Sequence, residues 1–212
     1  MLVLGLNTVA DVCEAALVDG ARVIAQVSEP MTQGHDARLA PVVDQVMREA
    51  GLAFQKLDRV AVIVGPGSFT GVRVGVSFAR ALALALDIPA VGVSSLEALD
   101  QLPREGDVIG VLAAKRRPPQ RSWWVQQLNA GRGVAEPGEL DEAGVMALVR
   151  QIGTVCGQTE GLELAGVSAV SARPSAISAA LFAGRLAAND LPAARPVYVR
   201  EPDAAPMRPV RT

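Results

Sequence analysis

Histidine and cysteine are scarce in this sequence of 212 residues, which contains one histidine and two cysteines. His35 has no second histidine and no clustered carboxylates at ligand spacing, which disfavours a metal site; we expect it to cap a helix or face solvent. With one histidine and no Gly-x-Ser-x-Gly motif, a Ser-His-Asp hydrolase has little support. Cys13 and Cys156 lack the spacing of a zinc or redox motif, so we expect two buried thiols.

An excess of either charge is also missing, because 20 basic and 22 acidic residues give a net charge of −2. RNA-binding domains usually carry a positive excess, so direct RNA binding is not expected. The one concentrated basic segment, Lys115–Arg121, comes just before Trp123 and Trp124. Basic residues beside aromatic rings suit RNA. We favour the alternative, a solvated loop followed by a strand with its two tryptophans on opposite faces and at least one in the core.

Long uninterrupted hydrophobic runs are absent as well. The apolar start of the chain stops at Asn7, and residues 72–93 are interrupted by two arginines, Asp87 and Pro89. A membrane-spanning helix needs about 20 consecutive apolar residues. No signal peptide is recognised, so we expect a soluble, cytoplasmic protein that does not bind membranes. Its 50% hydrophobic residues suffice for the core of one domain or two small lobes.

A glycine-rich segment, GPGSFTG at residues 65–71, joins an apolar β-branched run to a run rich in Ala and Leu. This pattern predicts a buried strand over 59–64 and a helix over 70–86 with Thr70 as N-cap. Backbone N–H groups at such a corner can bind phosphate. However, the segment has neither a Walker lysine nor the glycine spacing of a dinucleotide fingerprint, so we favour a tight structural turn. The predicted turn residues are Gly65, Gly67, Thr70 and Gly71.

Small residues recur at every fourth position of the predicted helix 70–86. They are Gly71, Gly75, Ala79 and Ala83, and such a row permits close approach of another element. The row packs either on the sheet of the chain itself or against a helix of another molecule, and periodicity does not decide between these alternatives. A second amphipathic helix is predicted over 36–50, with Pro41 in its first turns and Gly51 at its end.

The order of the predicted elements indicates an α/β fold. Three strands, over residues 2–6, 12–18 and 22–27, precede the helix, strand and helix described above. This order is shared by actin-like and Hsp70-like ATPases. Further along the chain we predict strands over 108–113 and 123–128, a loop over 131–138, and helices over 141–151 and 175–188. We therefore predict an N-terminal lobe over 1–100, a reduced C-terminal lobe over 101–200 and an extended, proline-rich tail over 201–212.

Three segments resemble the TsaB (YeaZ) family of the bacterial tRNA threonylcarbamoyladenosine pathway. They are VGPGSFTGVRVG, the GHDARLAP segment before residue 42 and the late segment PVYVREPDA. The resemblance implies an α/β actin-like ATPase (ASKHA) fold with two small lobes, and a non-catalytic subunit that supports TsaD. TsaD transfers a threonylcarbamoyl group to N6 of adenine 37 in tRNA, and the ATPase TsaE joins the complex. The resemblance further implies a homodimer when TsaD is absent, only indirect contact with tRNA, and no cofactor of its own, with ATP, if any, at the level of the complex.

In the family, the helices that correspond to 36–50 and 70–86 contact TsaD or a second copy. We therefore predict these partner-binding residues: Leu39, Val42, Val43, Val46, Val72, Gly75, Val76, Ala79 and Ala83. Asn7 stands where active relatives carry an Asp that organises magnesium, and Ala113 stands where the family usually has an Asp. A small ATPase or kinase is disfavoured by Asn7 and by the missing loop lysine. A peptidase is disfavoured by the missing nucleophile and base.

Overall fold

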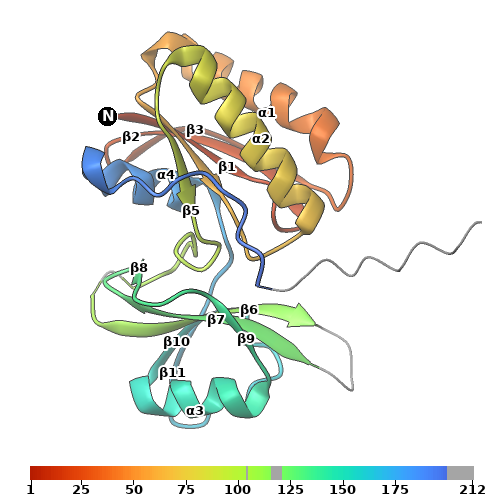
Figure 1. Cartoon of the computed structure of the whole chain (residues 1–212), viewed down its shortest axis with the longest axis vertical. Helices are drawn as coiled ribbons and strands as arrows, with labels where there is room; N and C mark the ends of the chain where they lie inside the picture. The colour runs from red at the N-terminus through yellow and green to blue at the C-terminus, as the bar shows by residue number, and fades with distance from the viewer. Residues whose placement is uncertain (104, 116–120, 200–212) are drawn as a thin grey trace, which may run out of the picture.

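The computed structural model describes residues 1–103, 105–115 and 121–199, which form two lobes on two mixed β-sheets (Figure 1). Strands from residues 2–93 build the first sheet, and strands from residues 107–171 build the second. The predicted tail over 201–212 and most of the basic segment Lys115–Arg121 lie outside the described residues.

Five strands form the first sheet, in the order β3-β2-β1-β4-β5. They are β1 (Leu2–Asn7), β2 (Val12–Asp19), β3 (Arg22–Pro30), β4 (Arg59–Ile63) and β5 (Ala90–Val93). The first three are antiparallel neighbours, whereas β4 and β5 run parallel to β1 and are reached through helices, because parallel strands need long crossover connections. Nearly all residues of β1, β2 and β4 are buried, as in a sheet covered on both faces.

The second sheet repeats this plan. Its strands are β6 (Asp107–Lys115), β7 (Ser122–Asn129), β8 (Arg132–Gly133), β10 (Thr154–Gly157) and β11 (Ser168–Ser171), with β9 (Gly138–Leu140) paired to β7. The order β8-β7-β6-β10-β11 matches the first sheet strand for strand, again with β10 and β11 parallel to β6. Helix α3 (Glu142–Ile152) follows β9, but residues 158–167, all described, form no helix between β10 and β11. The second lobe is therefore a reduced copy of the first.

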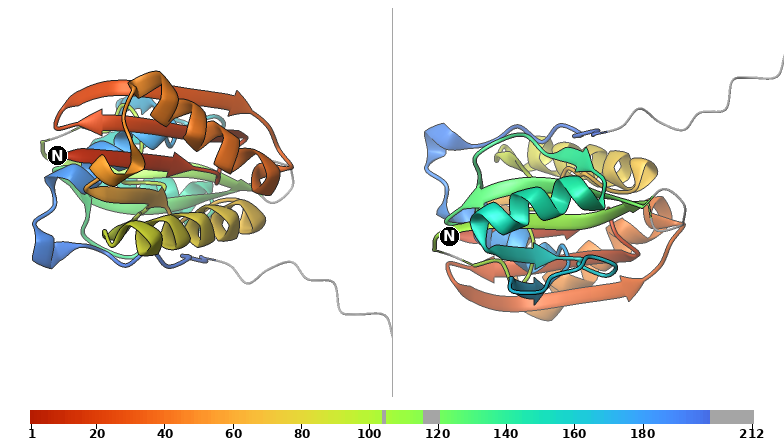
Figure 2. Two further views of the ribbon diagram at one scale, coloured as in Figure 1. Left: turned by 90° about the horizontal axis from the view of Figure 1, so that it is seen from above. Right: turned by 90° about the horizontal axis from the view of Figure 1, so that it is seen from below.

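Two long helices cover one face of the first sheet (Figure 2). They are α1 (His35–Ala50), which packs on β2 and β3, and α2 (Phe69–Leu86), which packs on β4 and β5. A third helix, α4 (Ala176–Arg185), covers the opposite face and packs on β1, β2 and β4. Two short 3₁₀ helices are η1 (Phe54–Lys56) and η2 (Ala188–Asp190).

The position of α4 corrects the predicted lobe boundary. Sequence order assigns this helix to the lobe over 101–200, yet it packs on the first sheet and belongs to its core. Close approach is possible because Gly5 of β1 has no side chain, and a Cβ there would overlap the carbonyl oxygen of Ala176 and meet Ala180. The first lobe therefore requires a segment from far along the chain.

Buried charges hold α4 at both ends. At its start, the N–H of Ala176 donates to Glu14 Oε2 of β2 at 2.9 Å. At its end, Arg59 Nη1 of β4 donates to the carbonyl oxygens of Ala183 and Leu186 at 2.6 and 2.8 Å. A negative group at the N-terminus and a positive group at the C-terminus complement the helix dipole, so both charges stabilise α4 on the sheet.

A C-terminal strap, residues 191–199, covers the edge of the first sheet at β5. The N–H of Gly92 donates to the carbonyl of Pro192 at 2.9 Å, and the N–H of Val197 donates to the carbonyl of Val64 at 2.8 Å. The strap then reaches α2, where the ring of Tyr198 lies 4.8 Å from that of Phe69. This edge strand is therefore protected from pairing with other chains.

Most predicted elements occur within a few residues of their predicted bounds, but some details differ. Helix α2 begins one residue before the predicted start, and its N-cap is Ser68 rather than Thr70, because Ser68 Oγ accepts from the N–H of Gly71 at 3.2 Å. Helix α1 ends at Gly51 in the left-handed conformation, as predicted. The predicted loop over 131–138 contains β8 and the start of β9.

The predictions for the tryptophans and cysteines are confirmed. Trp123 packs in the cluster under α3, and Trp124 packs against the cluster on the opposite face of the sheet. Both thiols are fully buried. Burial raises the pKa of the Cys13 thiol to about 11 and that of the Cys156 thiol to about 12.

Candidate functional site

The glycine-rich segment of residues 65–71, between β4 and α2, is called the glycine corner here. It packs directly on the turn that follows β1. The N–H of Ser68 donates to the carbonyl of Val9 at 3.0 Å, and Thr8 Oγ1 donates to the carbonyl of Gly71 at 2.7 Å. A Cβ on Gly71 would overlap the carbonyl oxygen of Thr8, and a Cβ on Gly67 would lie 2.8 Å from Val9. The glycines therefore permit contact between two backbone segments, which is the structural role favoured from the sequence.

Gly65 differs from the other glycines of this corner because its φ of 107° lies in a region that favours glycine. Its missing side chain also leaves room for the strap, since a Cβ would lie 2.6 Å from the carbonyl oxygen of Val197. Thr70, the fourth predicted turn residue, is exposed in the first turn of α2. The corner thus joins β4, α2, the β1 turn and the strap.

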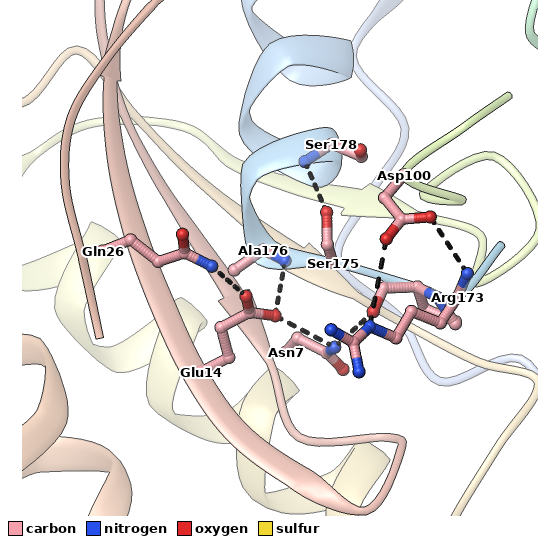
Figure 3. A network of polar contacts seen from close by, with 9 residues as sticks. Asn7, Glu14, Gln26, Asp100, Arg173, Ser175, Ala176 and Ser178 are labelled. Atoms are coloured by element: carbon pink, nitrogen blue, oxygen red, sulfur yellow. Dashed lines mark hydrogen bonds and ion pairs between the residues drawn. The ribbon is translucent and has the colours of Figure 1, made fainter. Parts of the chain in front are cut away.

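Asn7 lies fully buried beside this corner, and the chain itself uses its amide (Figure 3). Asn7 Nδ2 donates to the carbonyl of Pro174 at 2.9 Å and to Glu14 Oε2 at 3.4 Å, and Asn7 Oδ1 accepts from the N–H of Val9 at 3.2 Å. These bonds tie β1 to the segment that leads into α4. A neutral amide held in this way lacks the charge that a magnesium site requires.

Glu14 is the centre of the polar network drawn in Figure 3. Its carboxylate accepts from Gln26 Nε2 at 2.6 Å, in addition to the bonds from Asn7 and the N–H of Ala176. The sequence analysis did not single out Glu14. The available signal was a carboxylate inside the otherwise apolar run of β2, where an acidic side chain is rarely buried without partners.

His35 is buried rather than solvent-facing, so that expectation is wrong. Only 6% of the residue is exposed, and Nε2 lies 3.0 Å from the carbonyl oxygen of Val12. It is the first residue of α1, and the N-cap position is held by Gly34. The ring therefore fastens the start of α1 to β2. Within the described ranges, no group of three or more His, Cys, Asp or Glu residues could hold a metal ion.

The predicted partner-binding residues lie in the core of the chain itself, which corrects that prediction. All nine residues are buried, and each of the eight other than Gly75 is at most 3% exposed. They are Leu39, Val42, Val43, Val46, Val72, Gly75, Val76, Ala79 and Ala83. The small-residue row brings α2 close to β1 and β4, since a Cβ on Gly75 would lie 3.3 Å from Val62 Cγ2. Of the two alternatives left open by the periodicity, packing on the chain's own sheet is correct.

The opposite side of α2 is apolar as well. We define the α2 outer surface as the following residues, three of them exposed and three half-buried: Val74, Phe78, Ala81, Leu82, Leu84 and Ala85. Leu84 is 84% exposed, and the only charged residues of α2 are Arg73 and Arg80. By length and composition α2 could cross a membrane, but core helices of soluble proteins pass the same test and a third of α2 is buried.

Comparisons with known proteins agree with this fold. A family model described as TsaD, tRNA N6-adenosine threonylcarbamoyltransferase, matches residues 23–116. The chain is 39% identical over 99 residues to the tRNA threonylcarbamoyladenosine biosynthesis protein TsaB of Bacillus subtilis, covering 47% of this chain and 43% of that protein. It is 32% identical over 144 residues to TsaB of Escherichia coli, covering 68% of this chain and 62% of that protein. The matches thus span about half the length of these relatives.

Solved structures match over nearly the whole chain. YeaZ from Pseudomonas aeruginosa superposes with a TM-score of 0.67 at 26% sequence identity, covering 93% of this chain and 99% of that one. The predicted fold class, an α/β actin-like ATPase fold, is confirmed by this match and by the repeated strand order of the two lobes. The chain belongs to the TsaB (YeaZ) family.

Proposed function

We propose that this chain is a non-catalytic subunit in the biosynthesis of N6-threonylcarbamoyladenosine in tRNA, and that it binds and supports a TsaD-type transferase. The observation that carries the proposal is the α2 outer surface. Exposed contiguous apolar patches on folded proteins mark contact sites. The names of the similar proteins, TsaB and a TsaD-type family model, indicate the pathway to which such a contact belongs.

The geometry of α2 suits a helix-to-helix contact. Five apolar residues of the α2 outer surface recur at spacings of four, three, one and three residues, so they form a stripe along the helix. They are Val74, Phe78, Ala81, Leu82 and Ala85. The inner side of α2 is fixed in the core, which holds this stripe rigid. A partner helix would pack its own apolar side chains against it, as cores of protein interfaces do.

The contacts at the glycine corner support a non-catalytic role. Thr8, Val9 and the glycine segment are packed on each other, and the polar atoms of Asn7 are bonded within the chain. A phosphate-binding loop would need free N–H groups and space at this corner. We further propose that the chain is cytoplasmic and forms homodimers when the partner is absent. TsaE is proposed as a further component of the complex. Contact with tRNA is proposed to be only indirect, and ATP, if any, to bind at the level of the complex.

Binding of TsaD to a variant of the α2 outer surface tests the proposed contact. Ala81→Glu places a carboxylate on the exposed stripe, so the chain should fold while its affinity for purified TsaD falls at least about tenfold, because an unpaired charge would be buried. Ala147→Glu makes the same change at an exposed alanine of α3 and serves as the control. Size-exclusion chromatography checks that each variant is folded, and calorimetric titration measures its affinity for TsaD. Wild-type affinity of a folded Ala81→Glu variant would refute the assignment of the surface.

A further inference from the structure

A cavity of about 380 Å³ opens beside the first turn of α4, on the face of the first sheet opposite α1 and α2. Strands β2 and β3 contribute Glu14 and Gln26, α4 contributes Ser178, and the preceding segment contributes Arg173. Three branched apolar side chains complete its wall: Val12, Ile177 and Leu181. The cavity is therefore separate from the α2 outer surface.

The inner end of the cavity carries a buried negative charge. Glu14 is 5% exposed, and its three hydrogen bonds come from uncharged groups (Figure 3). Within the described residues no Lys or Arg forms an ion pair with it. Buried charges in proteins are normally paired, whereas the described residues supply no cation to this carboxylate.

Two further polar groups, from Ser178 and Gln26, lie in the cavity wall together with Glu14. Ser178 lines the cavity and is 4% exposed, and its hydrogen bond to Ser175 Oγ uses the backbone N–H, so that bond does not occupy the hydroxyl. Gln26 uses its Nε2 for Glu14, which leaves its carbonyl oxygen as an acceptor beside the carboxylate. A carboxylate, an amide oxygen and a hydroxyl together match a primary ammonium group, which has three donors.

The mouth of the cavity carries an arginine, Arg173, beside the carboxylate of Asp100. The Arg173 side chain is 79% exposed, and its Nε lies 3.9 Å from Asp100 Oδ2, at the outer limit of an ion pair. An arginine held this loosely can turn to bind a carboxylate through two parallel hydrogen bonds. The cavity thus presents a buried carboxylate at its inner end and, at its mouth, an exposed arginine that is only loosely paired with Asp100.

We propose that this cavity binds a free α-amino acid, with its ammonium group against Glu14, Gln26 and Ser178 and its carboxylate against Arg173. The volume equals that of roughly a dozen water molecules at about 30 Å³ each, enough for an amino acid with a branched side chain. Val12, Ile177 and Leu181 give such a side chain an apolar surface. This proposal does not depend on the proposed TsaD contact, which uses the other face of the sheet.

Amide chemical-shift titrations of the ¹⁵N-labelled chain test the proposal with three matched probes. L-valine carries both charged groups, isobutylamine lacks the carboxylate, and 3-methylbutanoate lacks the ammonium group. We expect L-valine to shift the amide signals of Glu14, Ala176 and Ser178 to saturation. We expect isobutylamine to bind more weakly and 3-methylbutanoate to leave these signals unchanged.

Two variants assign the binding groups. Arg173→Ala should weaken L-valine binding about tenfold, the usual loss for one charged hydrogen bond, and Ser178→Ala should weaken it without lowering thermal stability. Arg150→Ala removes the same charge beside another cavity, at α3, and should have no effect. The proposal is overturned if L-valine produces no saturable shift at these amides, if either single-charge probe binds as well as L-valine, or if Arg173→Ala binds L-valine like the wild type.

Discussion

At the scale of single residues, the glycine corner depends on missing side chains rather than on chemical groups. Gly71 lets the first turn of α2 touch the backbone of Thr8, whose hydroxyl donates back to the Gly71 carbonyl. The position and structural purpose of these glycines were predictable, because glycine is required where two backbones meet. The true N-cap, Ser68, was not, because Ser and Thr are both good caps and lie two residues apart.

Gly71→Val tests this role. The added side chain would meet backbone atoms of Thr8 that cannot move aside, so we expect a loss of about 3 kcal/mol or more in the free energy of unfolding. Chemical denaturation of the variant and the wild type measures the difference. Ala substitution at half-buried Gly138, where a Cβ meets nothing within 4 Å, is the control and should cost little. Equal stability of Gly71→Val and wild type would contradict the packing described for the corner.

The two buried thiols give a prediction for pH. Burial raises the pKa of Cys13 from 9.0 to about 11 and that of Cys156 from 9.0 to about 12, so the native chain keeps protons that the unfolded chain releases. Their stabilising contribution is present below pH 9 and is lost as the pH rises toward 11 to 12, by about 3 kcal/mol for Cys13 and about 4 kcal/mol for Cys156.

Thermal melting of the wild type and of the double variant Cys13→Ala, Cys156→Ala measures this effect. The double variant should be less stable near neutral pH because it leaves cavities, but its melting temperature should fall less steeply above pH 9. Parallel slopes for the two proteins would show that the thiols do not titrate differently in the native and unfolded states.

At the scale of elements, α2 shows what a hydrophobic pattern can and cannot predict. Its existence and bounds follow from an Ala- and Leu-rich run without proline. Which side is buried does not follow, because both sides are apolar and a periodic signal needs a polar face for contrast. The residues predicted for partner binding on α2 therefore lie on its buried side.

Substitutions at two alanines of α2 distinguish its buried side from its exposed side. Ala79 is fully buried, whereas Ala81 is exposed. Ala79→Trp should unfold the chain or lower its melting temperature by more than about 10 °C, since a large side chain cannot be accommodated against the sheet. Ala81→Trp should leave the melting temperature nearly unchanged. A stable, monomeric Ala79→Trp variant would contradict the burial of the small-residue row.

At the scale of the whole molecule, the sequence predicted the strand order of the first lobe but not its repetition in the second. The order of the first lobe follows from clear strand and helix patterns, but β8 to β11 have two to four residues each, too few for a recognisable alternation. The placement of α4 on the first sheet depends on Gly5, Glu14 and Arg59, which lie far from α4 in the sequence. No local pattern encodes such contacts.

The two lobes also hold each other through buried and half-buried polar contacts. Asn7 of the first sheet bonds to the carbonyl of Pro174, Ser94 Oγ donates to Gln126 Oε1 at 3.0 Å, and the N–H of Gly133 donates to Glu97 at 2.9 Å. These contacts join the two lobes, which fits the proposed use of the fold as a rigid support for a partner.

The central claim is that the chain supports threonylcarbamoylation of tRNA through the α2 outer surface. The most direct test is the N6-threonylcarbamoyladenosine content of tRNA, measured by nucleoside mass spectrometry in cells depleted of this chain. We predict a loss of the modified nucleoside that is restored by the wild type and by Ala147→Glu but not by Ala81→Glu. Unchanged content in the depleted cells, or full restoration by Ala81→Glu, would contradict the account.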